Sequence, residues 1–363
     1  MVQKNRSVFK LPAAALIALL LTACAAFEFA PREETAPPHH GPKSFLNVPY
    51  GPTHNLWGLI RCYLALDPAD PPAVPADLLA GDFKPEVAAP DLARIHSPDP
   101  ERIQVTWIGH SSFLVQVDGL NVLTDPVFSR RASPLPFIGP ERLVPPGLDF
   151  KDLPRVDAVL LSHNHYDHMD RDTLRRLGDG PRVFVPLGHR RLLASWGLFR
   201  VSELDWWQES PLGPVLIRAV PARHNSNRGL LDGDKSLWCG WAIQTGRGSI
   251  YFAGDTGYGP HFEEVGRRTG PVRLALLPIG AYSPRHLIRA VHVDPPEAVR
   301  AHLDLGARTS IAMHWGTFAL SPIPPSEPMA EPPLYLRRAL KEAGLEEDVF
   351  RLMNIGETLL LDR

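Results

Sequence analysis

The sequence is poor in cysteine, in net charge and in long apolar runs, and each shortage excludes a class of protein. Its 363 residues include 3 cysteines, too few for a disulfide-rich scaffold or a zinc ribbon. The 38 Lys and Arg against 40 Asp and Glu leave a net charge of -2, so we expect no broad basic face and no nucleic-acid partner. Apolar residues make up 44% of the chain, enough for a sizeable core. Since 15 histidines are present, any bound metal is expected to be held by nitrogen and oxygen atoms.

Residues 1–23 have the pattern of a lipoprotein signal peptide. A positively charged start precedes an apolar run over residues 11–23, which is shorter than the ~20 residues of a membrane-spanning helix. The run ends in Leu21-Thr22-Ala23-Cys24, which resembles the bacterial lipobox. The resemblance implies that Cys24 is lipidated and anchors the protein to a membrane. The alternative is a plain signal peptide whose cysteine is accidental.

The residue after this cysteine is Ala25 rather than Asp, which is typical of sorting to the outer membrane. We therefore expect a lipid-anchored protein of the bacterial cell envelope, on the outer membrane and facing the periplasm. Cys62 and Cys239 would then lie in an oxidising compartment, although no pattern indicates whether they pair.

Residues 24–100 are rich in proline and poor in periodic runs, which predicts a lipid-anchored tether followed by an irregular cover segment. One stretch, residues 56–64, has apolar side chains at helical spacing and predicts a short amphipathic helix. That helix either caps the core or forms a lipid-facing entrance. From about residue 101 to 363, strand-like runs alternate with helical patterns, which predicts one large α/β domain.

Several strand-like runs of this domain are followed by residues that bind metal. Runs that begin at Ala158, Val215, Ser249 and Thr309 lead to His163, His224, Asp255 and His314, respectively. Because buried strands of α/β folds deliver side chains from their ends to one place above a sheet, we expect these residues to converge in a cleft.

The densest cluster is His163-Asn164-His165-Tyr166-Asp167-His168, with four polar donors in six positions. Lone histidines such as His189 or His302 are usually structural, but four costly polar residues this close need a shared purpose. The whole set holds five histidines and two aspartates, enough for two tetrahedral or five-coordinate zinc ions with one bridging carboxylate.

This string resembles the H-x-H-x-D-H signature of the metallo-β-lactamase superfamily. The surrounding sequence resembles one branch, the N-acyl-phosphatidylethanolamine-hydrolysing phospholipase D family, over roughly residues 45–363. The matching segments run in the same order in both and include Thr106-Trp107-Ile108-Gly109-His110, Leu123-Thr124-Asp125-Pro126, Glu203-Leu204-Asp205-Trp206-Trp207, Phe252-Ala253-Gly254-Asp255-Thr256-Gly257-Tyr258, His292-Val293-Asp294-Pro295 and His314-Trp315-Gly316-Thr317-Phe318.

The resemblance implies a four-layer αββα sandwich with two Zn²⁺ at one edge. It assigns His163, His165 and His224 to the first zinc and Asp167, His168 and His314 to the second, with Asp255 as the bridge. The segment after His224, Asn225-Ser226-Asn227, departs from the relatives, so substrate contacts there are open.

Further roles follow from the chemistry and the resemblance together. Asp167, Asp255 and His292 are the expected catalytic residues, with His292 as an assisting acid or a substrate contact. Asp125 is expected to orient a ligating histidine or to cap a turn. His110 and Tyr166 are expected beside the substrate or behind the ligands, although an aromatic at residue 166 can serve packing alone.

The expected reaction is phospholipase D-type hydrolysis of an N-acyl-phosphatidylethanolamine-like lipid to phosphatidic acid and an N-acylethanolamine. Two alternatives stay open: a lactonase or other phosphodiesterase with the same zinc pair, and a zinc-binding envelope lipoprotein without turnover. Penicillin hydrolysis is less expected, because no cysteine lies near His224. The expected partners are a phospholipid substrate, the membrane and, by analogy with animal relatives, a second copy in a homodimer.

Overall fold

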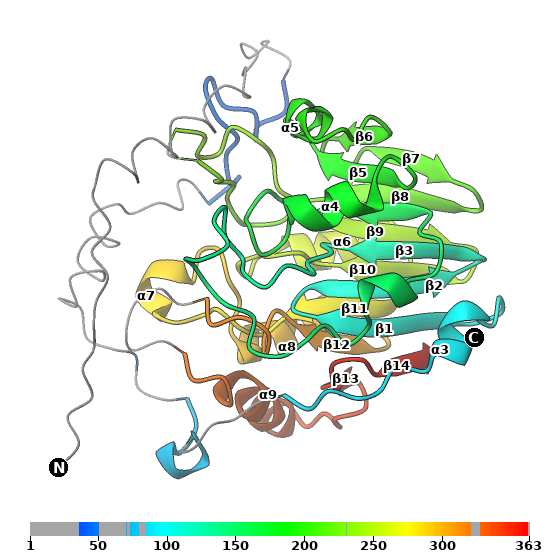
Figure 1. Cartoon of the computed structure of the whole chain (residues 1–363). Helices are drawn as coiled ribbons and strands as arrows, with labels where there is room; N and C mark the ends of the chain where they lie inside the picture. The colour runs from blue at the N-terminus through cyan, green and yellow to red at the C-terminus, as the bar shows by residue number, and fades with distance from the viewer. Residues whose placement is uncertain are drawn as a thin grey trace, which may run out of the picture.

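Two stacked β-sheets form the centre of the protein, which is described here from a computed structural model covering residues 36–50, 70, 73–79, 85–229, 231–320 and 327–361. Each sheet has seven strands. Helices cover both outer faces, so the layers run helix, sheet, sheet, helix (Figure 1). The αββα sandwich predicted from the sequence is confirmed.

The first sheet contains the early strands of the fold and the last strand of the chain. Across the sheet the order is β14 (Thr358–Leu361), β1 (Ile103–Gly109), β2 (Ser112–Val117), β3 (Leu120–Thr124), β4 (Ala158–Leu160), β5 (Arg182–Pro186) and β6 (Val201–Leu204). Strands β1 to β3 pair antiparallel, and β3 to β6 pair parallel. The strands β1, β3, β4, β5 and β6 therefore end at the same edge.

The second sheet has the order β13 (Phe350–Arg351), β12 (Ser310–Met313), β11 (Val272–Pro278), β10 (Gly248–Phe252), β9 (Gly240–Thr245), β8 (Val215–Val220) and β7 (Glu209–Leu212). Strands β10 to β13 are parallel, whereas β9 is antiparallel to both β8 and β10. As a result β8, β10, β11 and β12 share one direction.

Successive side chains along the strands of the first sheet alternate between its two faces. In β2, Phe113 and Val115 belong to the large core that includes the second sheet, while Leu114 belongs to the core under the outer helices. In β5, Phe184 faces the first of these cores and Val183 the second. Successive strand residues point to opposite faces, so one strand serves both layers.

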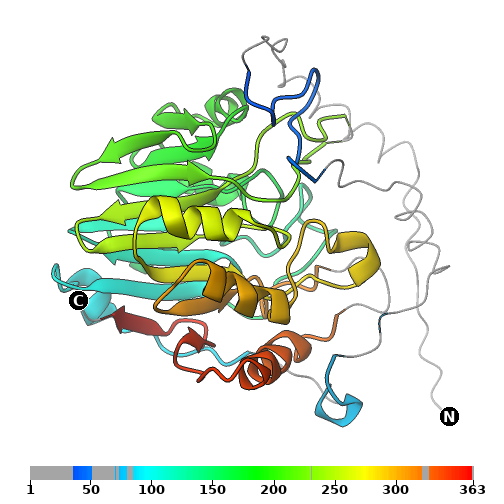
Figure 2. The same cartoon turned by 180° about the vertical axis from the view of Figure 1, so that it is seen from behind.

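The helices divide between the two outer faces, as the opposite views show (Figures 1 and 2). The core outside the first sheet includes residues of α3 (Leu92–His96), α4 (Arg171–Leu177) and α5 (Arg190–Ser195). The other side carries α6 (His261–Thr269), α7 (Arg285–Ile288), α8 (Pro295–Asp304) and α9 (Glu331–Glu342). Two 3-10 turns, η2 (Ala76–Leu79) and η3 (Phe150–Asp152), lie in the connections.

The start and the buried face of helix α8 can be explained from its residues. The side chain of Asp294 accepts a hydrogen bond from the amide of Glu297 at 2.9 Å, and Pro295 occupies the first helical position. Its buried side chains, such as Ala298 and Ala301, pack into the large core.

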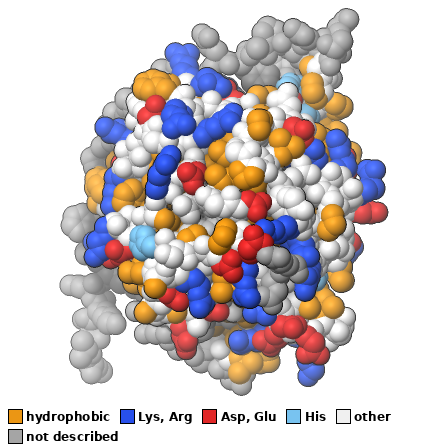
Figure 3. Space-filling model, turned by 90° about the vertical axis from the view of Figure 1, so that its right-hand side faces the viewer, with side chains coloured by type: hydrophobic (Ala, Val, Ile, Leu, Met, Phe, Trp, Pro, Cys, Tyr) orange, Lys and Arg blue, Asp and Glu red, His pale blue; other side chains and the backbone are white. Residues whose placement is uncertain are grey.

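The edge opposite the strand carboxyl ends is the face seen in Figure 3. Leu361 pairs there with Ile103 at the start of β1. On this face Lys and Arg side chains are interspersed with Asp and Glu (Figure 3).

Some features predicted for residues 24–100 fall outside the described residues. These are Cys24, Cys62 and the helix over residues 56–64. Cys239 carries a free, buried thiol. The domain boundary at residue 101 stays a prediction, and the described residue Val87 pairs with Ile355 of the main fold. No helix within the described ranges has both the length and the apolar character needed to cross a membrane.

Candidate metal centre

The predicted ligands gather at the edge where the parallel strands of both sheets end. In the first sheet, His110 follows β1, Asp125 follows β3 and His163 follows β4 by a short turn. In the second sheet, His224, Asp255 and His314 follow β8, β10 and β12. The loops of this edge lie at the left in Figure 1. Stacking the two sheets brings their carboxyl ends together, so residues distant in sequence meet.

The backbone at this edge is strained where it delivers these side chains. His110, Asp125 and His314 have positive φ values of 54°, 31° and 60°, which residues with a side chain rarely adopt. Strained backbone conformations of this kind are frequent at functional sites, where contacts with the surrounding structure maintain them. Gly254 also has positive φ, and a Cβ there would lie 2.5 Å from the Cβ of Ser162. Glycine therefore allows β10 to approach the end of β4 just before Asp255.

Three imidazoles form the first cluster, which we call the three-histidine group: His163, His165 and His224. His165 Nδ1 lies 2.8 Å from His163 Nε2 and 3.3 Å from His224 Nε2. One nitrogen of each ring lies within 4.8 Å of the others. Burial and the neighbouring imidazoles hold the pKa of His163 well below its usual value, and burial does the same for His224. Burial also lowers the pKa of His165. The lowered pKa values favour the neutral ring, which is the form that binds metal.

A second cluster, the aspartate group, contains His110, Asp167, His168 and His314. Asp167 Oδ2 lies 3.0 Å from His110 Nε2, 3.4 Å from His168 Nε2 and 3.5 Å from His314 Nε2. Burial alone would lower the histidine pKa values, but the carboxylates of Asp255 and Asp167 raise the pKa of His168 well above normal and that of His314 to about 9.

Asp255 lies between the two groups. Its Oδ2 is 3.0 Å from His314 Nε2 and 3.2 Å from His168 Nε2 on one side. On the other side it is 3.8 Å from His224 Nε2 and 4.0 Å from His163 Nε2. One carboxylate therefore faces ring nitrogens of both groups, as a bridging ligand would.

The donor atoms at this edge need a partner that the described residues do not supply. Buried atoms without any hydrogen-bond partner in the described structure include His168 Nε2, His314 Nε2 and Asp255 Oδ1. Leaving buried polar atoms unpaired is costly, and here they point into one cluster of imidazoles and carboxylates. Two divalent ions would satisfy them, and a nitrogen and oxygen donor set of this kind suits zinc, iron or manganese. The predicted ligand residues therefore fit a two-metal centre.

In His163, His168 and His224, the ring nitrogen that faces away from the clusters contacts another group. Asp125, fully buried, lies with Oδ2 2.6 Å from His168 Nδ1 and accepts the amide of Ser162 at 2.7 Å. The Ser162 hydroxyl donates to Asp125 and lies 2.9 Å from His163 Nδ1, and the Val291 carbonyl lies 3.0 Å from His224 Nδ1. These contacts set which nitrogen of each ring carries the proton and aim the other one at the cluster.

Sequence reasoning included Asp125 but missed Ser162 and Val291. Ser162 directly precedes His163, so its position next to the metal string was the available signal. The contribution of Val291 is a backbone carbonyl, which has no sequence signal.

His292 and Tyr166 lie at different distances from the ligands. His292 Nδ1 is 4.0 Å from Asp255 Oδ2 and has no hydrogen-bond partner among the described residues. Burial lowers the pKa of His292 to about 4, against the opposing charge of Asp255. The Tyr166 hydroxyl instead donates to the carbonyl of Arg228 at 2.9 Å, and the Arg228 guanidinium lies 4.1 Å from the ring centre. Tyr166 therefore packs against the loop after β8.

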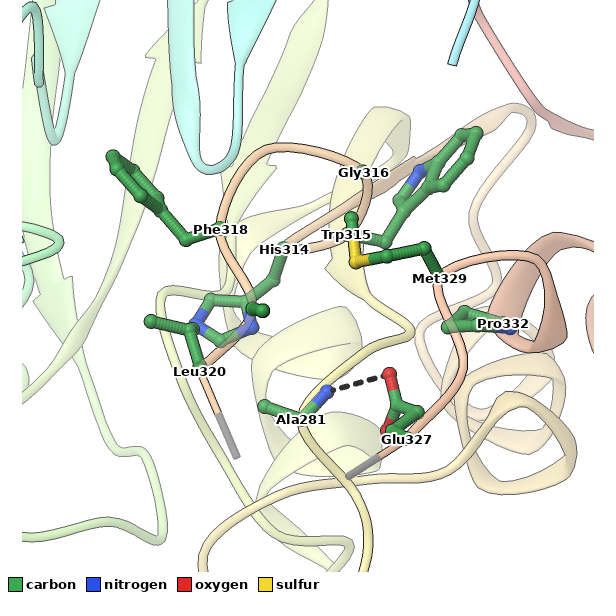
Figure 4. A pocket seen from close by; sticks show the side chains of 10 residues that line it. Ala281, His314, Trp315, Gly316, Phe318, Leu320, Glu327, Met329 and Pro332 are labelled. Atoms are coloured by element: carbon green, nitrogen blue, oxygen red, sulfur yellow. Dashed lines mark hydrogen bonds between the residues drawn. The ribbon is translucent and has the colours of Figure 1, made fainter. Parts of the chain in front are cut away.

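A small pocket of about 20 Å³ adjoins the aspartate group through His314. Apolar side chains line most of it, including Phe318, Leu320 and Met329 (Figure 4). Glu327 contributes a carboxylate that accepts the amides of Ala281 at 3.1 Å and Tyr282 at 2.9 Å. Burial raises the pKa of Glu327 to about 7. The pocket thus places an apolar wall next to a predicted metal ligand.

Comparison with known proteins agrees with this geometry. Residues 120–315 match the sequence model of the β-lactamase superfamily domain. An uncharacterized protein of Mycobacterium tuberculosis is 42% identical over 281 residues, covering 76% of this chain and 70% of that protein. The N-acyl-phosphatidylethanolamine-hydrolyzing phospholipase D 1 of Caenorhabditis elegans is 38% identical over 270 residues, covering 69% of this chain and 74% of that protein.

Among solved structures, a metallo hydrolase from the archaeon Ignicoccus hospitalis superposes with a TM-score of 0.54 at 25% identity. The superposition covers 72% of this chain and 99% of that one. The family match, the sheet architecture and the ligand cluster at the strand ends agree with one another. The chain therefore belongs to the metallo-β-lactamase superfamily and is a metal-dependent hydrolase.

Proposed function

We propose that the protein is a zinc-dependent phosphodiester hydrolase of phospholipase D type. Its substrate would be an N-acyl-phosphatidylethanolamine or a close relative, cleaved to phosphatidic acid and an N-acylethanolamine. The observation that carries the proposal is the pair of metal-binding groups joined by Asp255, in a chain 38% identical to an enzyme named for this reaction. Two divalent ions held about 3.5–4 Å apart lower the pKa of bound water and neutralise charge on phosphoryl oxygens.

The protein residues have separate tasks in this proposal. The three-histidine group would hold one zinc, and Asp167, His168 and His314 the other, with Asp255 touching both. Asp125 keeps the proton on Nδ1 of His168 by accepting from it at 2.6 Å, which leaves Nε2 free to bind metal. His110, 3.0 Å from Asp167 Oδ2, holds that carboxylate in place.

The residues around the small pocket beside His314 are mostly apolar, and they adjoin the residues that would face the phosphodiester. In hydrolysis of the proposed substrate, the bond between phosphorus and the ethanolamine oxygen breaks, and the oxygen of water joins phosphorus. The leaving alcohol takes up a proton.

Heavy-oxygen water tests the substrate and the broken bond together. We expect purified, zinc-loaded protein to release N-acylethanolamine and to place the label in the phosphate of phosphatidic acid, with the Asp255→Asn variant as the inactive control. Label in the alcohol would refute attack at phosphorus. Rapid opening of a lactone with no turnover of any phospholipid would show that the protein is a lactonase. Zinc binding without any hydrolysis would show that it is a zinc-binding lipoprotein without turnover.

His292 is the residue that we propose to exchange a proton with the leaving group, because its unpartnered Nδ1 faces the centre. We expect His292→Gln to lower kcat about a hundredfold while the protein still binds two ions. His302→Gln is the matched control, since that buried histidine bonds the hydroxyl of Ser310 instead. Loss of an ion in His292→Gln would show that His292 is a metal ligand. An unchanged kcat would show that His292 takes no part in the reaction.

We also propose that the protein is held by a lipid on Cys24 in the cell envelope, on the outer membrane and facing the periplasm. Residue 36, the first that the structure describes, follows Cys24 by 12 positions, a chain that spans at most about 40 Å. The anchor would therefore keep the site close to a phospholipid surface. Cys24→Ser is expected to release protein from membranes or to leave an unprocessed precursor. Normal processing with full membrane retention would contradict the anchor.

A further inference from the structure

The N-terminal segment, residues 36–50, contacts the backbone of a predicted metal ligand. The buried side chain of Asn47 donates through Nδ2 to the carbonyl of His224 at 2.6 Å, and its Oδ1 accepts from the His224 amide at 3.1 Å. Both polar groups of this ligand's backbone thus bond to one side chain 177 positions earlier in the chain. In Figures 1 and 2 the segment, coloured blue, lies against the loops of the ligand edge.

The other side of the His224 loop is held by the fold itself. The amide of Arg223 donates to Thr256 Oγ1 at 2.9 Å, and the amide of Gly257 donates to the carbonyl of Arg223 at 2.7 Å. The Arg223 guanidinium lies 4.1 Å from the ring centre of Tyr50. The loop that carries His224 is therefore held between residues 36–50 and the loop after β10.

Two histidines attach the N-terminal segment to the first sheet. His39 Nε2 lies 2.6 Å from Asp205 Oδ1, and His40 Nε2 lies 2.9 Å from Asp205 Oδ2. The His39 ring stacks on Trp206 at 4.2 Å. Further along, the amide of Phe45 donates to the carbonyl of Asp234 at 2.7 Å.

The group of His39, His40 and Asp205 could hold a cation by composition, but its geometry is that of a hydrogen-bonded clip. The distances from the two histidine nitrogens to the oxygens of Asp205 are hydrogen-bond lengths. They are shorter than the distances from Asp255 Oδ2 to His314 Nε2, 3.0 Å, and to His224 Nε2, 3.8 Å. None of the unpartnered buried side-chain atoms of the described residues belongs to this group. The clip therefore needs no ion to satisfy it.

We propose that residues 36–50 form a strap that positions the third histidine of the metal centre. Asn47 is the positioning residue, and the His39–His40–Asp205 clip keeps the strap in place. The strap lies outside residues 120–315, the part matched by the family model, so this support comes from a segment that the family model does not include. Without Asn47, the buried amide and carbonyl of His224 lose their partners, and the imidazole loses its fixed orientation.

The inference rests on the proposed metal centre, so its test measures metal binding as well as activity. Full-length protein is stripped of metal and titrated with Zn²⁺ against a chromophoric chelator. We expect Asn47→Ala to weaken binding of one of two ions by about tenfold to a hundredfold. The matched control is Asn121→Ala, which removes a side chain that also bonds a backbone carbonyl and another side chain, at the start of β3. It should change zinc affinity less than about twofold.

The His39→Ala/His40→Ala variant tests the clip and keeps the strap inference testable if Asn47→Ala does not fold. Because the clip acts through Asn47, its effect on zinc affinity should not add to that of Asn47→Ala in a double-mutant cycle. Wild-type protein that binds no zinc would overturn the proposed function together with this inference. Two ions bound equally by wild type and Asn47→Ala would overturn the strap alone. Loss of a third ion in the histidine variant would show that the clip is a metal site.

Discussion

The two halves of the metal centre are built on opposite electrostatic principles. The three-histidine group has imidazoles crowded against one another, and the nearest carboxylate oxygen, on Asp255, is 3.8 Å from His224. The aspartate group has Asp167 at its centre, with three ring nitrogens between 3.0 and 3.5 Å from one oxygen. Accordingly the pKa of His163 is lowered and that of His168 is raised.

This difference indicates how each half behaves without metal. In the aspartate group, the carboxylates raise the pKa values of His168 and His314, so an incoming cation must displace protons there. In the three-histidine group, the pKa values of His163 and His224 are lowered, which favours neutral rings, so a cation displaces fewer protons.

Asp255→Asn should have the largest effect, because the Asp255 carboxylate faces ring nitrogens of both groups. Removing its charge leaves two divalent ions sharing a neutral amide, so we expect activity to fall roughly a thousandfold and at least one ion to be lost. Metal analysis and steady-state rates on the same preparation check this. Equal activity and two ions in the variant would show that Asp255 does not bridge the groups.

Acidification should have the second largest effect, because it should lower zinc affinity at one group more than at the other. In the metal-free protein the pKa of His314 is about 9, so below that pH a proton must leave before the ring binds metal. Affinity at the aspartate group should thus fall about tenfold for each pH unit and each proton displaced. The three-histidine group, whose pKa values are lowered, should change little between pH 8 and 6. Zinc titrations at these pH values test the contrast, and equal slopes for both ions would contradict it.

Asp125→Asn should affect the aspartate group more than the three-histidine group. The carboxylate of Asp125 accepts from His168 Nδ1, and an amide in its place can hold the ring in the wrong tautomer. We expect zinc affinity at one site to drop about tenfold to a hundredfold, with a smaller drop at the other site, which Asp125 reaches through the Ser162 hydroxyl. Competition with a chelator resolves the two ions. An equal loss at both sites would mean that Asp125 supports the edge as a whole.

Ser162→Ala should produce the smallest change. The Ser162 hydroxyl donates to Asp125 and faces His163 Nδ1, so it links Asp125 to the three-histidine group. In the variant, Asp125 still accepts a hydrogen bond from the backbone amide of residue 162. The free energy of binding should weaken by about 1 kcal/mol, the net value of one hydrogen bond. Calorimetric titration of zinc can measure a loss of this size. A loss as large as that of Asp125→Asn would show that the hydroxyl couples the two groups.

Much of the fold and of the donor set could be predicted from sequence. Short apolar runs identified the strands, polar residues placed after them identified the ligand edge, and the family resemblance predicted the αββα sandwich. The string from His163 to His168 is local, so its spacing is visible in the chain itself. The described residues bring the seven predicted ligands together at that edge, with Asp255 between two clusters, and His110 joins the cluster around Asp167. Their role as ligands stays a prediction.

Support contacts were harder to predict. The carbonyl of Val291 and the side chain of Asn47 bond His224 from distant segments, and neither has a recognisable pattern. Sequence reasoning treated residues 24–100 as a tether and cover segment. The structure places one part of that segment, around Asn47, directly against a predicted ligand.

The amino-acid sequence by itself determined the chemistry of the donors and their position at strand ends, because both are properties of residue type and local period. Only the tertiary structure decided that His110 lies beside Asp167, that Asp255 faces both groups and that Asn47 holds His224. The physical reason is that these distances depend on how two twisted sheets stack and where the connecting loops cross. That arrangement is set by packing of the whole core, which no local pattern encodes.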